Sequence, residues 1–102
     1  MRLIVFFDLP METATQRRNY AQFRKYLVSS GYLMMQKSVY SKLALTERIA
    51  TGLIAQLRAN KPREGLVQVL KITERQYETI ACIAGSVNEG YELDDTDAMV
   101  LL

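Results

Sequence analysis

The apolar segment at the start of the chain constrains the fold most. Residues 2–10 read RLIVFFDLP, and on an extended chain successive side chains point to opposite faces. Both faces of this segment are therefore apolar until the carboxylate of Asp8, a pattern typical of a strand in the middle of a sheet. Pro10 has no backbone N–H to donate to a neighbouring strand, so it ends the segment. We predict a central strand over residues 2–8 and ask why it ends in a charge.

A helix follows this strand. The sequence TATQ, Thr13–Gln16, has the spacing of a capping box, which starts a helix. Apolar residues then recur at helical spacing and predict the buried stripe: Tyr20, Phe23 and Leu27. Gly31 suits the left-handed backbone position just past a helix end. The predicted helix runs from about Ala14 to Ser30.

The next 30 residues predict extended chain and a second helix. Residues 32–43, YLMMQKSVYSKL, read either as one bent strand or as a tight pair of strands broken near Gln36–Ser38. Thr46 and Glu47 open the second helix, and residues 60–62 stop it. Its predicted buried stripe is Ala50, Leu53, Ile54 and Leu57.

The order of elements indicates the fold class. Residues 65–73, GLVQVLKIT, predict another strand, TERQ at 73–76 predicts a single helical turn, and YETIACIAG at 77–85 predicts a short strand. The order strand, helix, two extended segments, helix, strand matches a ferredoxin-like βαββαβ α/β sandwich with an additional C-terminal strand. We expect one domain over residues 1–84 and an acidic tail over residues 85–102.

This architecture leaves an apolar sheet face without a cover. With both helices on one face, either the odd-numbered or the even-numbered apolar side chains of residues 2–8 would meet water. A second copy packed sheet to sheet about a two-fold axis is the simplest cover. AMVLL, residues 98–102, could also add an edge strand to the neighbouring copy. We therefore expect a homodimer.

The residue types that are missing exclude several chemistries. The chain has no His and one Cys, Cys82, so His-based nucleophilic triads, a His general base and the usual zinc sites are excluded. Hydrolysis would have to rely on carboxylates and a hard cation, Mg²⁺ or Mn²⁺. We expect neither a signal peptide nor a membrane span. A single Cys precludes an internal disulfide and fits the cytoplasm.

The charges are segregated along the chain. Residues 1–75 hold all 13 Lys and Arg residues against five acids, a net charge of +8, whereas residues 76–102 hold six acids and no Lys or Arg. A basic body is typical of a nucleic-acid binder, and an acidic tail could dock on a basic protein partner. The alternative is that the Lys and Arg side chains only solvate helix faces.

Four motifs in this order carry a family resemblance. IVFFDLP, the Arg-rich QRRNYAQFRKYL, GYLMMQKSVYSKL with its QxSVY signature, and ITERQYETI cover residues 1 to about 84. Together they resemble CRISPR-associated protein 2, the small subunit of the spacer-acquisition complex and an endonuclease or endoribonuclease in some members. The chain departs from the family at Tyr40, where Phe is usual, and in its long acidic tail.

The resemblance implies a role for Asp8. Family members are ferredoxin-like homodimers in which the matching aspartates, one per subunit, lie near the two-fold axis and are the proposed ligands of a divalent metal. Asp8 would then be both the catalytic and the metal-binding residue, with Mg²⁺ or Mn²⁺ activating water for attack on a phosphodiester. The alternative from the residues alone is that Asp8 only hydrogen-bonds the turn before Pro10.

The basic helix and the signature strand supply the expected nucleic-acid contacts. Residues seven apart on a helix lie nearly above one another, so Arg17 with Arg24 and Arg18 with Lys25 form adjacent lines. Such lines suit phosphate contacts that do not read bases. The expected nucleic-acid-binding residues are Arg17, Arg18, Arg24, Lys25, Lys37, Ser38 and Lys42. Each could instead be a solvated surface group. Tyr20, Tyr26 and Tyr40 are expected in the core or an interface.

Three functions follow as alternatives. The first is a metal-dependent endonuclease acting on DNA or RNA through paired Asp8 side chains. The second, which the resemblance implies most strongly, is a homodimeric scaffold that bridges subunits of the CRISPR-associated integrase and holds a short DNA duplex for insertion. The third is a ferredoxin-like regulatory module for a small ligand, which no Gly-rich phosphate loop supports.

Overall fold

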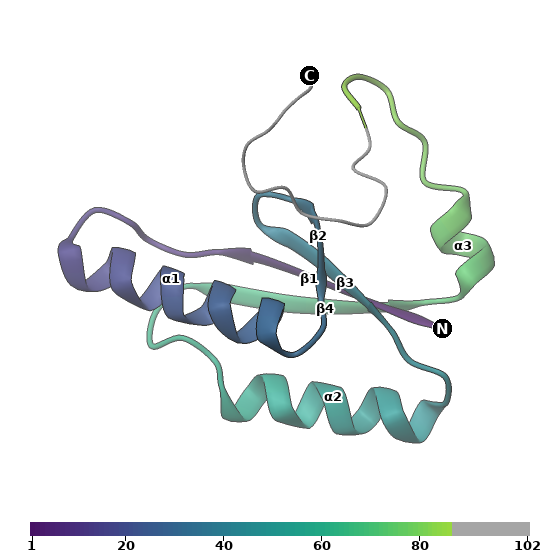
Figure 1. Ribbon diagram of the computed structural model, residues 1–102, viewed down its shortest axis with the longest axis horizontal. Helices are drawn as coiled ribbons and strands as arrows, with labels where there is room; N and C mark the ends of the chain where they lie inside the picture. Colours follow the sequence, from purple (N-terminus) through teal and green to yellow (C-terminus); the bar gives the residue numbers. More distant parts are fainter. Residues whose placement is uncertain (87–102) are drawn as a thin grey trace.

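The computed structural model describes residues 1–86 as four strands and three helices (Figure 1). In chain order they are β1 (Arg2–Asp8), α1 (Ala14–Ser29), β2 (Leu33–Gln36), β3 (Val39–Leu43), α2 (Glu47–Ala59), β4 (Leu66–Ile72) and α3 (Glu74–Glu78). The first six elements have the predicted βαββαβ order, which confirms the ferredoxin-like α/β sandwich. None of the helices within residues 1–86 is long and apolar enough to cross a membrane.

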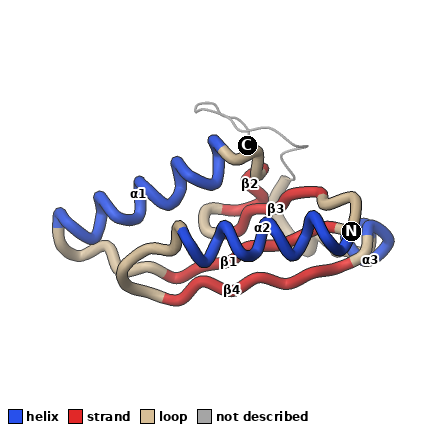
Figure 2. The backbone as a smooth tube through the Cα atoms, turned by 90° about the horizontal axis from the view of Figure 1, so that it is seen from below, coloured by secondary structure: helices blue, strands red, loops and turns tan. Residues whose placement is uncertain are grey.

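The sheet has the strand order β2-β3-β1-β4, and every neighbouring pair is antiparallel. β1 is therefore a central strand, as its two apolar faces predict. Buried side chains of α1 and α2 pack on the same face of the sheet, and Figure 2 shows α2 in front of the strands with α1 beside it. One layer of helices thus packs on one layer of sheet.

The core lies between this helix layer and the odd-numbered residues of β1. Leu3 and Val5 are fully buried and Phe7 nearly so. Phe7 forms an aromatic cluster with α1 and β3, with its ring centroid 5.2 Å from that of Phe23 and 5.9 Å from that of Tyr40. These aromatic pairs add about 0.5–1.5 kcal/mol each beyond their buried area. The predicted stripes of both helices face this core.

Local signals set both ends of α1 as predicted. The Thr13 side chain accepts a hydrogen bond from the Gln16 backbone N–H, and the Gln16 side chain accepts one from the Thr13 backbone N–H. At the other end, Gly31 has φ of +91°. The N–H groups of Gly31 and Tyr32 donate to the carbonyl oxygens of Val28 and Leu27, the paired bonds of a Schellman motif.

The ambiguous segment 32–43 is a pair of strands. β2 and β3 are joined by a tight turn at Lys37 and Ser38, and the register shifts between Met34 and Gln36. The extra residue there, Met35, forms a bulge that bends β2. The structure thus selects the second of the two predicted alternatives.

The prediction of a strand over residues 77–85 is wrong. The TERQ turn continues as α3 to Glu78, and residues 79–86 form no strand. A strand needs a neighbouring edge for its backbone hydrogen bonds, and Ile80 and Ile83 in this segment are 55% and 92% exposed. The remaining tail prediction, including the edge strand at residues 98–102, lies outside the described residues.

Candidate functional site

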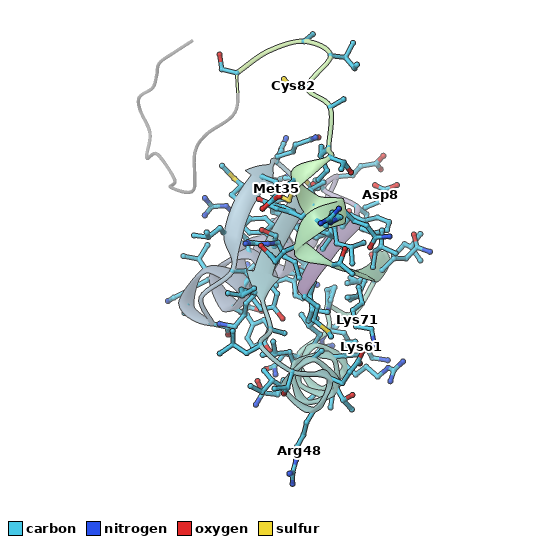
Figure 3. All side chains as sticks on the ribbon, turned by 90° about the vertical axis from the view of Figure 1, so that its right-hand side faces the viewer. Asp8, Met35, Arg48, Lys61, Lys71 and Cys82 are labelled. Carbon is cyan, nitrogen blue, oxygen red and sulfur yellow. The ribbon has the colours of Figure 1, made fainter. Side chains whose placement is uncertain are left out.

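Asp8 is the last residue of β1 and lies at one end of the sheet. It pairs with Leu66 at the start of β4. Its side chain points to the opposite face of the sheet from that of Phe7, which points into the core. Asp8 is exposed on the sheet face that the helices do not cover, away from α2 and Arg48 (Figure 3). We call the end of the sheet where β1 finishes at Asp8 and β4 begins at Leu66 the Asp8 end.

The turn that follows Asp8 is held by other side chains. The Gln16 carboxamide oxygen accepts from the backbone N–H of Glu12 at 2.9 Å and of Thr13 at 3.0 Å. The Arg17 guanidinium donates to the carbonyl oxygens of Met11 at 3.2 Å and Glu12 at 3.0 Å. Within residues 1–86 the Asp8 carboxylate takes part in no hydrogen bond or ion pair. The alternative that Asp8 serves only to hydrogen-bond this turn is therefore wrong.

Gly65 brings the start of β4 against the Asp8 backbone. Its φ is +99°, and a Cβ atom built on it would lie 2.8 Å from the Asp8 carbonyl oxygen and 2.6 Å from Leu9 Cδ2. Only glycine combines this backbone conformation with such a close approach. Gly65 thus fixes the backbone that carries the carboxylate.

The β2–β3 turn reaches the same end of the sheet. The Phe7 backbone N–H donates to the carbonyl oxygen of Ser38 at 3.1 Å, which places Ser38 beside the end of β1. The Tyr20 hydroxyl of α1 donates to the Lys37 carbonyl oxygen at 3.3 Å. The structure therefore brings together Asp8, Arg17, Lys37 and Ser38 from the expected set.

The other helix cations lie farther along α1. Arg18, Arg24 and Lys25 are exposed, with Arg24 and Lys25 about two turns beyond Arg17. The Arg24 guanidinium lies near Tyr40 on the strand side of α1. Burial raises the pKa of Tyr40, and the positive charge of Arg24 opposes that rise.

Lys42 lies at the opposite end of the molecule from Asp8. It is on the helix side of β3, where its ammonium donates to the Ser30 carbonyl oxygen at 2.8 Å and lies 5.8 Å from the centroid of the Tyr32 ring. Burial raises the pKa of Tyr32 to about 12. Lys42 therefore helps to end α1, apart from the cluster at the Asp8 end.

Apolar side chains dominate the sheet face that carries Asp8, which we call the open face. The helix layer does not cover it, and five of its large apolar side chains are 37–56% exposed: Phe6, Leu33, Leu43, Leu66 and Leu70. Ile4 and Ser41 at its centre are buried. Of the even-numbered apolar side chains of β1, Phe6 meets water as predicted, whereas Ile4 is buried.

Arg2 ties α3 to the other end of this face. Its guanidinium makes two hydrogen bonds of 2.9 Å to the Glu74 carboxylate and lies 4.1 Å from the centroid of the Tyr77 ring. The hydrogen bonds from Arg2 hold the pKa of Glu74 below its ordinary value. Sequence reasoning missed this clasp, because its partners are 72 residues apart.

Sequence reasoning also missed the connection between α2 and β4. Residues 60–64, NKPRE, carry Lys61 and Arg63, whereas only residues 60–62 are predicted from the sequence to have a role, as a helix stop. Both side chains are exposed, and the structure places them beside α1 at the Asp8 end. The sequence signal that could have indicated these residues is the presence of two cations, two positions apart, in a short connection.

One copy of the chain supplies little of a metal site. Within residues 1–86 no three His, Cys, Asp or Glu side chains are grouped to hold a metal ion. Both carboxylate oxygens of Asp8 are free of partners from the described part of the chain, as a ligand requires, but Asp8 is one ligand. A complete site at Asp8 would need groups from outside the single chain.

Comparison with known sequences identifies the family. The sequence model of CRISPR associated protein Cas2 matches residues 1–80, which include β1, α1 and the QxSVY hairpin. This chain belongs to the Cas2 family. The resemblance inferred from its four motifs is thereby confirmed.

Similar Cas2 proteins come from several bacteria. A Treponema denticola protein named CRISPR-associated endoribonuclease Cas2 is 48% identical over 101 residues, 99% of this chain and all of the relative. Proteins of the same name from Streptococcus mutans and Lacticaseibacillus rhamnosus are 44% and 41% identical. Those alignments cover 83% and 84% of this chain, and 78% and 85% of the relatives. The Treponema protein therefore also aligns with the acidic tail.

Proposed function

We propose that this chain acts in CRISPR adaptation, where its homodimer binds the DNA duplex to be integrated and bridges subunits of the CRISPR-associated integrase. The observation that carries the proposal is the open face: an apolar sheet surface that α1 and α2 do not cover, with a carboxylate at its edge that has no hydrogen-bond or ion-pair partner within residues 1–86. Membership of the Cas2 family is consistent with it.

The open face supports a two-fold dimer. Exposed apolar patches of this kind mark interaction sites, and a two-fold axis lets one such face cover its own copy. A chain of 102 residues buries less of its surface than a large domain, so it gains more from a partner. When two open faces meet, the helix layers point outward and leave the basic side chains accessible.

The basic residues at the Asp8 end and on the neighbouring part of α1 support binding of a duplex. Arg18 and Lys37 are exposed and in no ion pair within residues 1–86, and Arg17 uses only one of its guanidinium nitrogens on the turn. Lys and Arg contacts to phosphates fix the position of a duplex without reading its sequence. This suits a protein that must accept many different DNA segments.

Asp8 supports a second activity, metal-dependent phosphodiester cleavage. Asp8 side chains from the two subunits would hold one Mg²⁺ or Mn²⁺, which typically binds through one or two carboxylates and keeps several waters. The ion would supply activation of water at neutral pH, a task that this chain cannot give to a histidine. The relatives named endoribonuclease favour this activity on RNA. We propose DNA as the alternative substrate.

The tail over residues 85–102 is the proposed docking segment for the integrase. It is acidic, so it would be repelled by DNA and attracted to a basic protein surface. Its alignment with the Treponema relative is consistent with a retained role.

Copurification with the integrase and a short DNA duplex across a salt series tests the scaffold. We expect a complex containing two copies of this chain that loses the duplex as salt rises, because phosphate contacts release counterions. A chain that ends at residue 85 should keep the duplex and lose the integrase. Failure of the full chain to join a complex, or a complex whose duplex content is indifferent to salt, would contradict the scaffold role.

A further inference from the structure

A cleft on the helix side lies between α1 and the connection that joins α2 to β4. It has a volume of about 270 Å³, with Asn19, Gln22 and Tyr26 on its α1 wall and Lys61 and Arg63 on the other. The buried ring of Phe23 forms part of its floor. Lys61 is on the same side of the sheet as α2, whereas Asp8 is on the opposite side (Figure 3).

Most polar side chains of this cleft can donate a hydrogen bond and have no partner within residues 1–86; Asn60, which donates to the Gln56 carbonyl oxygen at 2.9 Å, is the exception. Within residues 1–86, the side chains of Asn19, Gln22 and Tyr26 make no hydrogen bond, and Lys61 and Arg63 are in no ion pair. Among the described residues, no acidic side chain lines the cleft. The adjacent Glu64 accepts a hydrogen bond from the Gln16 carboxamide nitrogen at 3.0 Å, outside this lining.

Two predicted cations of α1 extend the same surface. Residues four and three apart on a helix are neighbours, so Arg18, Gln22 and Lys25 form one line along α1. Gln22 belongs both to this line and to the cleft wall. Arg17 and Arg24 lie on the other flank of α1, toward β3. Arg18 and Lys25 therefore lie on the cleft side of α1, and Arg17 and Arg24 lie on its β3 side.

We propose that this cleft, with Lys61 and Arg63 as its cations, binds the sugar-phosphate backbone of a nucleic-acid duplex. The inference rests on the proposed function and extends its binding surface from α1 onto the α2–β4 connection. Backbone contacts are made by Lys and Arg together with neutral Asn, Gln and Tyr donors, which is the set found here. Gln22, on the middle part of α1, connects the cleft to the line of cations formed by Arg18 and Lys25.

Salt-dependent duplex binding tests the cleft. A fluorescently labelled duplex is titrated with the full chain and with a Lys61→Gln/Arg63→Gln double variant at several salt concentrations. Each lost phosphate contact lowers the slope of log affinity against log salt by about 0.9, so the double variant should lose about 1.8 and bind about tenfold more weakly. Circular dichroism checks that both proteins are folded.

A matched control removes the same charge elsewhere. Arg48→Gln/Arg75→Gln replaces two exposed cations on α2 and α3 that do not line the cleft, and its slope should stay close to that of the natural chain. Equal losses from both double variants would overturn the site in favour of a net-charge effect. An unchanged slope for Lys61→Gln/Arg63→Gln would overturn the site alone, leaving duplex binding intact. A natural chain that binds no duplex at low salt would overturn the proposed function as well.

Discussion

Asp8 combines exposure with the absence of any protein partner among the described residues. A surface carboxylate that serves the fold would be expected to cap a turn or pair with a cation, and Gln16 and Arg17 already satisfy the turn beside it. The carboxylate is therefore available for a ligand. The proposed metal-binding role would explain why an apolar strand ends in an acid.

Asp8→Asn should separate catalysis from folding. The stability of the variant should stay within about 0.5 kcal/mol of the natural chain, because no contact is lost. Manganese-dependent cleavage of a labelled RNA or DNA should fall at least about 100-fold, because a metal ligand contributes several kcal/mol. Duplex binding should be retained. Cleavage that survives in Asp8→Asn would contradict the catalytic role. If the natural chain cleaves neither RNA nor DNA, the proposed cleavage activity is wrong and only the scaffold role remains.

At the scale of elements, local sequence signals predict helix ends well, whereas contacts between distant segments are not predicted from the sequence. The capping boxes at Thr13 and Thr73 form as predicted, because a cap depends on residues three positions apart. The segment after Glu78 has the composition of a strand, but a strand forms only where a sheet edge is available to pair with it. The local sequence does not show whether such an edge lies nearby. The same limit applies to the candidate site, since only the fold brings Lys61 and Arg63 to α1.

The clasp between Arg2 and Glu74 should make the position of α3 sensitive to acid. Hydrogen bonds from Arg2 lower the pKa of Glu74 below the ordinary value of 4.5. The contribution of the clasp is therefore complete above about pH 4.5 and is lost as pH falls through the lowered pKa. Amide hydrogen exchange of residues 74–79, corrected for its intrinsic pH dependence, should rise as the solution is acidified.

Glu74→Gln should release α3 at neutral pH and remove this acid-induced step. The matched control is Glu78→Gln, an exposed glutamate on the same helix with no hydrogen-bond or ion-pair partner within residues 1–86. It should leave exchange unchanged. Equal protection of α3 in the Glu74 and Glu78 variants would show that the clasp does not hold the helix.

At the scale of the whole molecule, the open face and the basic helix side are on opposite sides of the sheet. Pairing through the open face would bring two copies of Asp8 toward one axis and leave the cations of both subunits facing outward. Leu70, which is 52% exposed on the open face, is the side chain whose change tests this arrangement. Leu70→Glu places a charge where an apolar interface should form and should yield monomers. Leu45→Glu, at a site 77% exposed between β3 and α2, should leave the assembly intact.

Sedimentation equilibrium of the full natural chain tests the central claim most directly. A dimer formed through the open face predicts a mass of twice 11.7 kDa, reduced to 11.7 kDa by Leu70→Glu but not by Leu45→Glu. A natural chain that sediments at 11.7 kDa at every concentration, or a dimer that Leu70→Glu leaves unchanged, would contradict the account.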